Sequence, residues 1–243
     1  METEPNRRIY SLRLFPLNCV LFPQFTIQLN VFEDRYKRMI QECMDSGAPF
    51  GVVLIRDGEE TGQPAVPHDA GCTARIVSVE RLDDGRLTVV AAGESRFRLL
   101  DYSVADAGYL TGRVEDLVDV YGHGDVAPDV LATAVELFST YLKLLAERAS
   151  LSIPPIDLPD EPDRLAYCIA AISPLALAVK QKLLETADAE LRLVMETELL
   201  RRQIARLEER REHRADAGKV AIRFRPMGQD DEWLAGWVKR SRN

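Results

Sequence analysis

Apolar and polar residues alternate over short stretches in the first half of the chain, and proline, glycine and acidic turns separate these stretches. This pattern is typical of β-strands. Strands are predicted at Ser11–Phe15, Thr26–Val31, Phe50–Ile55, on both sides of Asp83-Asp84-Gly85 within Cys72–Val90, at Arg96–Val104 and at Tyr109–Val118, with breaks at Gly93 and Gly108. Asp-Gly supplies the positive backbone angles of a tight hairpin turn. Several short strands within about 115 residues predict a small, partly open barrel.

A single helix is predicted among these strands. Its apolar positions recur at helical spacing, with Gly47 placed to end it: Tyr36, Met39, Ile40, Cys43 and Met44. Pro16 is expected to end the first strand, and Leu17–Phe22 to cross the core as a buried segment that Pro23 stops. Glu59–Ala70, which contains two prolines and little periodicity, is expected to be a surface loop.

Helical periodicity replaces alternation from Pro128 onward. The apolar face of the first long helix would consist of Val130, Leu131, Ala134, Val135, Phe138, Leu142 and Leu145. Asp163–Ile172 is predicted as a helix, and Ser173-Pro174 as the N-cap and first residue of the next. Asp188 is expected to cap a last helix whose apolar positions are Leu191, Val194, Met195 and Leu199. The predicted class is α+β, with a barrel at 1–122, a helical bundle at 126–217 and a tail at 218–243.

Charge is distributed unevenly along the chain. The formal net charge is -8, but residues 219–243 carry six Lys or Arg against three Asp or Glu, which leaves -11 for residues 1–218. An acidic body argues against binding nucleic acid or an anionic membrane through its whole surface. The basic tail also carries Phe224, Trp233 and Trp237. We expect it to fold back on the barrel, to complete a partner's barrel in a homodimer, or to dock a larger machine.

Motifs of common enzymes are absent from the sequence. No G-x-x-x-x-G-K-[ST] or G-x-S-x-G pattern occurs, and His68, His123 and His213 fall in loop or solvated-helix contexts. The four cysteines lack metal-ligand spacing, so neither a metal nor a cofactor is expected. No apolar stretch reaches the roughly 20 residues of a membrane helix, and no secretory signal opens the chain. We therefore expect a cytoplasmic protein without catalytic activity.

Several ordered motifs resemble the N-terminal domain of the ATP-dependent Lon proteases. They are Leu14-Phe15-Pro16-Leu17, Val20-Leu21-Phe22-Pro23, Ile27-x-Leu29-x-Val31-Phe32, Glu33-Asp34-Arg35, Asp69-x-Gly71-Cys72-Thr73-Ala74-Arg75-Ile76, Gly93-x-x-Arg96-Phe97 and Lys180-Gln181-Lys182-Leu183-Leu184-Glu185. The resemblance extends over about residues 9 to 210 and implies a PUA-like pseudo-barrel followed by a helical bundle. In that fold the Phe-Pro units would fill the core and end strands.

The same resemblance implies a module that binds unfolded or tagged polypeptides, with a protease or chaperone machine as a further expected partner. Glu33, Asp34 and Arg35 match the position of a charged segment implicated in substrate contact, although acids at a helix N-terminus also complement its dipole. The ATPase module and the Ser-Lys peptidase dyad of full-length Lon are not in this sequence, so we expect a free-standing substrate-binding domain. The alternatives are RNA binding, through the basic tail or through a patch formed by Arg75, Arg81, Arg86, Arg96 and Arg98, and a small-molecule pocket in the barrel.

Overall fold

The computed structural model describes residues 8–120, 126–151 and 158–216. Contacts divide the chain into two compact units, which are described separately here. The first contains Met1–Val126 and Glu161–Arg192, and the second contains Ala127–Asp160 and Leu193–Asn243. The first unit thus joins all the strands to part of the helical region. The sequence-based division at residues 122, 126 and 217 stays a prediction.

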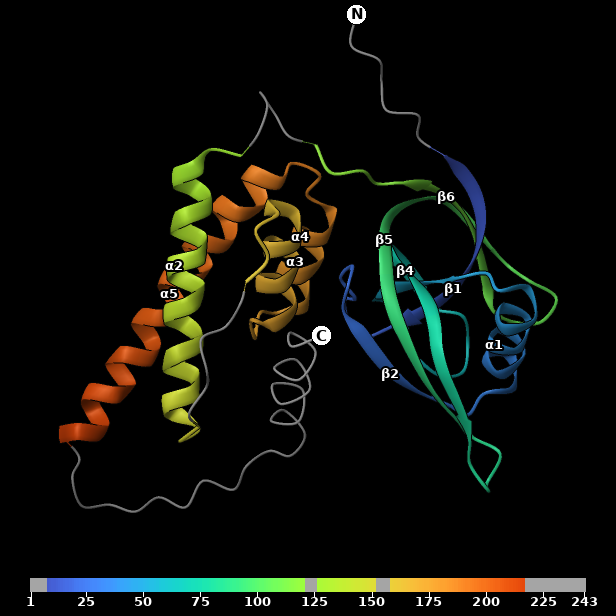
Figure 1. Cartoon of the computed structure of the whole chain (residues 1–243). Coiled ribbons are helices and arrows are strands. Elements are labelled where there is room, and N and C mark those ends of the chain that lie inside the picture. Colours follow the sequence, from blue (N-terminus) through green and yellow to red (C-terminus); the bar gives the residue numbers. More distant parts are fainter. Residues whose placement is uncertain (1–7, 121–125, 152–157, 217–243) are drawn as a thin grey trace, which may run out of the picture. The chain divides into compact units, whose positions relative to one another are not determined.

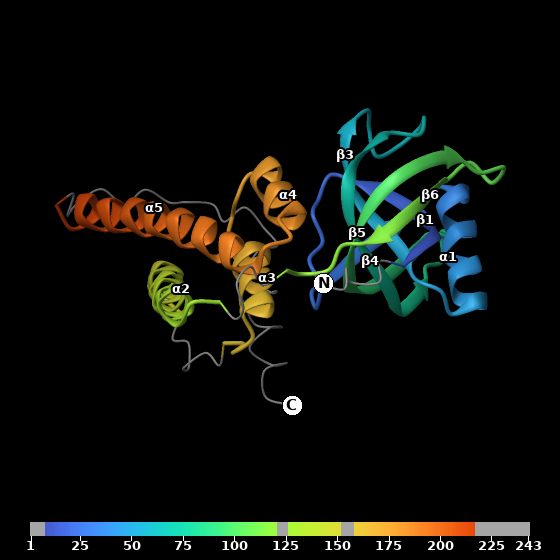
Figure 2. The same ribbon diagram turned by 90° about the horizontal axis from the view of Figure 1, so that it is seen from above.

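Six strands form a ring in the first unit (Figures 1 and 2). They are β1 (Ile9–Leu17), β2 (Thr26–Val31), β3 (Phe50–Asp57), β4 (Val66–Arg81), β5 (Leu87–Val104) and β6 (Leu110–Asp116). The order is β2-β5-β4-β3-β1-β6, and an additional β5–β6 pairing closes the ring. Among the six strands that the structure describes, β1 and β3 alone pair in parallel, and the other pairings are antiparallel. The predicted α+β pseudo-barrel followed by helices is confirmed.

Proline and glycine interrupt the strands less than the sequence indicates. Pro16 does not end β1, which continues to Leu17 and pairs Pro16 with Val53. This is possible because the β6 ladder on the other side of β1 stops at Leu14, so no partner there requires an N–H from Pro16. Gly93 likewise lies inside the continuous β5.

The loop predicted at Glu59–Ala70 is shorter than expected. β4 begins at Val66, and Pro67 pairs with Ile55 where the β3–β4 register shifts, a position at which a sheet tolerates proline. The hairpin at Asp83-Asp84-Gly85 is confirmed: Gly85 has a φ of 77°, and the N–H of Leu82 donates to the carbonyl of Arg86. Thr26–Val31 is a strand with the predicted bounds.

Helix α1 (Asp34–Ser46) packs against the ring through its apolar face, as predicted (Figure 1). Tyr36, Met39, Ile40 and Cys43 are buried, whereas Met44 is 48% exposed. Gly47 ends the helix with a φ of 65°. The Phe15 ring stacks on Tyr36 with centroids 4.1 Å apart. Phe15 and Phe22 are both buried, as expected for core-filling residues of the two Phe-Pro units.

The first unit also contains α3 (Pro162–Ile172), α4 (Leu177–Glu185) and the start of α5 (Ala189–Asp216). The prediction that Ser173 caps α4 is wrong, because the helix begins at Leu177 and its cap residue is Ala176. The Ser173 hydroxyl is instead buried without a hydrogen-bond partner in the described structure. The predicted cap of α5 is confirmed, since the N–H of Leu191 donates to Asp188 Oδ1 at 3.0 Å.

The second unit contains α2 (Pro128–Arg148) and the remainder of α5. Helix α2 buries Ala134, Phe138 and Leu142 as predicted, while Val135 is 36% exposed. The face predicted for α5 is wrong. Leu191 and Val194 are 51% and 45% exposed, whereas the buried positions among the described side chains are Ala189, Arg192, Leu193, Glu196, Thr197, Leu200 and Ile204. No helix among the described residues is long and apolar enough to cross a membrane.

Candidate functional site

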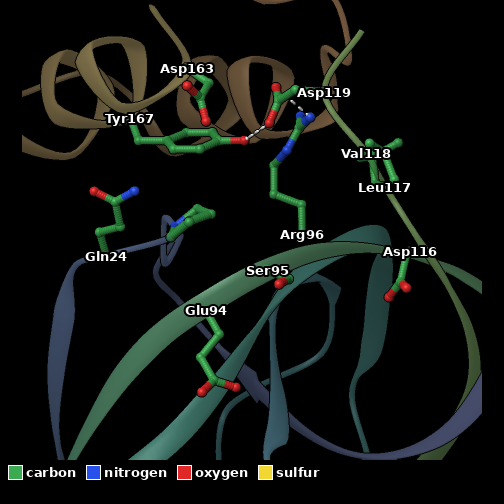
Figure 3. Close-up of a pocket in the computed structure, with 11 residues that line it drawn as sticks. Gln24, Glu94, Ser95, Arg96, Asp116, Leu117, Val118, Asp119, Asp163 and Tyr167 are labelled. Atoms are coloured by element: carbon green, nitrogen blue, oxygen red, sulfur yellow. Dashed lines mark hydrogen bonds and ion pairs between the residues drawn. The ribbon is translucent and has the colours of Figure 1, made fainter. Parts of the chain in front are cut away.

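A groove of about 310 Å³ opens in the first unit where one end of the ring meets α3 (Figure 3). It is lined by Pro23, Gln24, Glu94, Ser95, Arg96, Asp116, Leu117, Val118, Asp119, Asp163 and Tyr167. These residues come from the segment before β2, from the middle of β5, from the segment that leaves β6 and from α3. Segments far apart in the sequence therefore build one concave surface, the usual form of a binding site.

A β-bulge shapes the floor of the groove. The β4–β5 register passes from Ala74–Gly93 to Cys72–Arg96, so Glu94 and Ser95 together oppose the single residue Thr73. The Thr73 hydroxyl closes this irregularity, because its oxygen accepts from the N–H of Ser95 at 3.0 Å and donates to the Ser95 carbonyl at 3.2 Å. Bulges bend a strand and redirect the side chains that follow. Here the next side chain is Arg96.

The second Phe-Pro unit forms one wall of the groove. The N–H of Gln24 donates to the Gly93 carbonyl, and the N–H of Gly93 donates to the Phe25 carbonyl, both at 2.8 Å. A side chain at position 93 would place its Cβ 2.4 Å from the Phe22 carbonyl oxygen, so only glycine allows this approach. Gln24 has a φ of 69°, a conformation that costs energy for a residue with a side chain. Such strain often accompanies functional sites.

A buried cluster of charges lies at the edge of the groove on the α3 side. Asp119 Oδ1 accepts from Nη2 of Arg96 at 2.9 Å and from Nη2 of Arg192 at 2.5 Å, and Oδ2 accepts from the hydroxyl of Tyr167. The side chains of Arg96 and Arg192 are 1% and 0% exposed, compared with 17% for Asp119. The Tyr167 ring lies 4.6 Å from the Arg192 guanidinium carbon and 5.6 Å from that of Arg96. This cluster joins β5, the segment after β6, α3 and α5.

The same arginines also donate hydrogen bonds to backbone carbonyls at the C-terminal end of α4. Nη1 of Arg96 donates to the carbonyls of Leu184 and Thr186, each at 2.7 Å, and Nη1 of Arg192 donates to Thr186 at 2.9 Å. The last carbonyls of a helix lack partners within the helix and carry a partial negative charge, so guanidinium groups stabilise them. The cluster is therefore structural as well as adjacent to the groove.

Burial sets the proton affinities in this cluster. Desolvation lowers the pKa of Arg96, with a further lowering by Arg192, while Tyr167 and Asp119 raise it. Desolvation raises the pKa of Tyr167 well above its usual value, against the opposing effect of the two arginines. The phenol therefore remains neutral and keeps its proton for the bond to Asp119.

Most acidic groups of the groove already have partners. Glu94 pairs with Arg75 and Asp119 with two arginines, and Asp116 lies near the phenol of Tyr10, whose pKa is raised by burial and then by this carboxylate. In the part of the chain that the structure describes, no group of three or more His, Cys, Asp or Glu is arranged to hold a metal ion. The groove offers amide, hydroxyl and carboxylate groups beside the aliphatic side chains of Leu117 and Val118. This is chemistry for binding a polar, extended ligand.

The predicted contact residues Glu33, Asp34 and Arg35 do not line this groove. Glu33 caps α1 without a side-chain hydrogen bond to the helix and pairs with Arg35 at 2.9 Å. Arg35 also lies over the Tyr36 ring and donates to the Gly108 carbonyl at 3.4 Å. Only the Asp34 side chain is fully exposed. Asp34 pairs with Lys37 at 3.3 Å, so all three residues have partners within the described structure, and a role in polypeptide contact stays a prediction.

Three other predicted residues, Phe224, Trp233 and Trp237, lie outside the described residues. Of the groove and its charge cluster, the sequence analysis named Arg96, within the candidate RNA-binding patch, but missed Asp119, Tyr167 and Arg192. Asp119 and Tyr167 gave no local signal, since their role depends on contacts across 48 residues of sequence. Arg192 carried no such signal either, because the helix face on which it is buried also contains Glu196 and Thr197.

The model of the ATP-dependent protease La (LON) substrate-binding domain matches residues 11–202. The chain belongs to this family. It is 29% identical over 195 residues to Lon protease 2 of Myxococcus xanthus, covering 79% of this chain and 24% of that protein. It is also 29% identical over 208 residues to the Lon protease of Escherichia coli K12, covering 82% of this chain and 26% of that protein. The chain thus spans about a quarter of the length of these proteases.

Solved structures agree with the family assignment. The crystal structure of a Lon N-terminal domain protein from Xanthomonas campestris is 31% identical, with a TM-score of 0.60 over 76% of this chain and 96% of that one. The N-terminal domain of the Mycobacterium avium complex Lon protease has a TM-score of 0.56, over 81% of this chain and 98% of that one. Its sequence identity is 18%, so it supports the fold alone. The resemblance to the Lon N-terminal domain seen in the sequence is confirmed.

Proposed function

We propose that the protein is a non-catalytic module that binds unfolded or tagged polypeptides, and that the groove beside Arg96 and Asp119 is the binding site. Membership of the Lon substrate-binding domain family over residues 11–202 carries this proposal. The groove supports it, because a polypeptide is a ligand with both polar backbone groups and apolar side chains, and Gln24, Asp119 and Val118 offer both kinds of contact.

Within this proposal the chain acts as an adaptor or scaffold in protein quality control and performs no chemistry itself. The family match concerns the substrate-binding domain, and the sequence carries no P-loop motif. A cytoplasmic location and a protease or chaperone machine as partner belong to the same proposal, because the relatives that match are Lon proteases.

RNA binding is less well supported. Four of the five arginines that would form a basic patch already have acidic partners: Arg75 pairs with Glu94, Arg86 with Asp84, Arg96 with Asp119 and Arg98 with Glu115. Paired guanidinium groups are poorly available to phosphates, and nucleic-acid binding depends on such contacts.

Fluorescence anisotropy tests the proposal with two labelled probes. One is reduced, carbamidomethylated α-lactalbumin, which cannot refold, and the other is single-stranded RNA. We expect saturable binding of the polypeptide and none of the RNA. Binding of RNA alone, abolished by high salt, would replace the polypeptide proposal with the nucleic-acid one.

A further inference from the structure

Asp119 has one hydrogen-bond acceptor position left over. Each carboxylate oxygen offers about two such positions. Oδ1 uses both for Arg96 and Arg192, whereas Tyr167 is the one donor to Oδ2 among the described residues. Asp119 lines the groove and, unlike the two arginines, keeps 17% of its side chain exposed. The carboxylate that carries the spare position is therefore partly open to the groove.

Arg192 holds this carboxylate in place without lining the groove itself. Its side chain is fully buried and bridges Asp119 to the Thr186 carbonyl. Backbone hydrogen bonds next to Asp119 reinforce the bridge: the N–H of Val120 donates to Ala187, and the N–H of Ala189 donates to Val120. The segment after β6 is thus fixed to the first turn of α5.

We propose that Asp119 accepts a hydrogen bond from an N–H group of the bound polypeptide, and that Arg192 is the positioning residue that keeps its spare acceptor facing the groove. The inference rests on the proposed function and assigns roles in polypeptide binding to Asp119 and Arg192. The donor is a backbone amide or a lysine ammonium group, both of which a polypeptide supplies. Coupling is reciprocal, so a ligand bound at Asp119 also steadies the first turn of α5.

The experiment compares the dissociation constant of the labelled α-lactalbumin probe for four proteins. These are the wild type, Arg192→Met, Arg192→Lys and the control Arg13→Met. Arg13 pairs with Glu42 at 2.9 Å, also in the first unit, but does not line the groove. We expect Arg192→Met to weaken binding roughly 10-fold, the loss typical of a hydrogen bond to a charged group, and Arg192→Lys to restore part of it. Arg13→Met should bind as the wild type does.

Two further readouts separate positioning from mere stability. In the wild type, binding of the probe should slow hydrogen exchange of the Ala189 and Arg192 amides. If Arg192 had a purely structural role, the probe would not need to change exchange at these amides. A probe with acetylated lysines identifies the donor: weaker binding indicates lysine, and unchanged binding indicates the backbone.

The outcomes distinguish the two proposals. If the wild type binds no polypeptide, the proposed function and this inference fail together. The second case is that the wild type binds and Arg192→Met binds the probe equally well, while the probe leaves exchange at Ala189 and Arg192 unchanged. The inference then fails and the proposed function stands. If Arg192→Met does not fold, Arg192→Lys takes its place in this comparison.

Discussion

Arg96 Nη2 and Asp119 Oδ1 lie 2.9 Å apart across 23 residues of sequence, with the arginine side chain 1% exposed. This pair connects the bent strand β5 to the segment that leaves β6. Asp119 also pairs with Arg192, so this one carboxylate interacts with two buried guanidinium groups. Removal of that carboxylate would leave two like charges close together in a region with little water.

Replacement of Asp119 should therefore be strongly destabilising. We expect Asp119→Ala to lower the free energy of unfolding by about 3 kcal/mol, the lower end for a broken buried pair because Asp119 is partly exposed. Urea unfolding measures this loss. Asp163→Ala, in the same groove but without a described ion pair, should change the free energy by less than about 0.5 kcal/mol. Equal effects of the two variants would show that the cluster contributes little.

Gln24 offers a stabilising substitution. Its φ of 69° suits glycine, so Gln24→Gly should raise the free energy of unfolding by roughly 0.5 kcal/mol despite the added freedom of the unfolded chain. Gln28→Gly, at an exposed position inside β2, should lower it by roughly 0.5–1 kcal/mol. Thermal unfolding of both variants checks the prediction, and a loss of stability in both would mean that Gln24 is not strained.

Gly93 should not tolerate a side chain. A Cβ would lie 2.4 Å from the Phe22 carbonyl oxygen, so Gly93→Ala must displace the segment that forms a wall of the groove. We expect a loss of about 2 kcal/mol or more in chemical denaturation, within the range for overpacking. Gly85→Asn is the control, since that site is open and asparagine accepts its φ of 77°. A well-folded Gly93→Ala protein of wild-type stability would contradict this packing.

Buried thiols should make the fold sensitive to alkaline pH. Burial raises the pKa of Cys72 from about 9 in the unfolded chain to about 12 in the fold. The folded state therefore holds this proton more tightly, and the stabilisation is complete below pH 9 and lost as pH rises toward 12. The slope should approach roughly 1.4 kcal/mol per pH unit for this group. In urea unfolding between about pH 9 and 10.5, Cys72→Ala should reduce the fall in the free energy of unfolding with pH. If the slope is the same as in the wild type, groups other than Cys72 cause the fall.

The predicted contact segment can be tested by a comparison within it. Arg35→Ala should cost about 1–2 kcal/mol, because it removes the contacts with Glu33, Gly108 and the Tyr36 ring. Asp34→Ala, at a fully exposed side chain, should leave urea unfolding unchanged. If Asp34→Ala nevertheless weakens polypeptide binding, the sequence-based site at residues 33–35 gains support at the expense of the groove.

Sequence patterns predicted those features that depend on near neighbours. The periodicity of Tyr36, Met39, Ile40 and Cys43 identified α1, and Asp84-Gly85 identified the hairpin, because helix faces and tight turns are determined within a few residues. The buried face of α5 was misassigned because Arg192 and Glu196 are buried there, and charged residues normally face water.

The groove could not be predicted for a related reason. Its floor depends on a bulge opposite Thr73, and its edge on Asp119 meeting Arg96 and Arg192 through long-range contacts. A single sequence contains no local signal for such contacts. Family-level motifs located the domain, but they did not indicate which of its polar residues converge.

Polypeptide affinity of a groove-blocking variant tests the central claim most directly. Val118 is 45% exposed in the groove, and Val77 is 63% exposed at a β4 bulge outside it. We expect Val118→Arg, whose long side chain fills the groove and can pair with Asp116, to weaken binding of the labelled α-lactalbumin probe at least roughly 10-fold. Val77→Arg should bind as the wild type does. Equal affinity of two folded variants and the wild type would contradict the assignment of polypeptide binding to this groove.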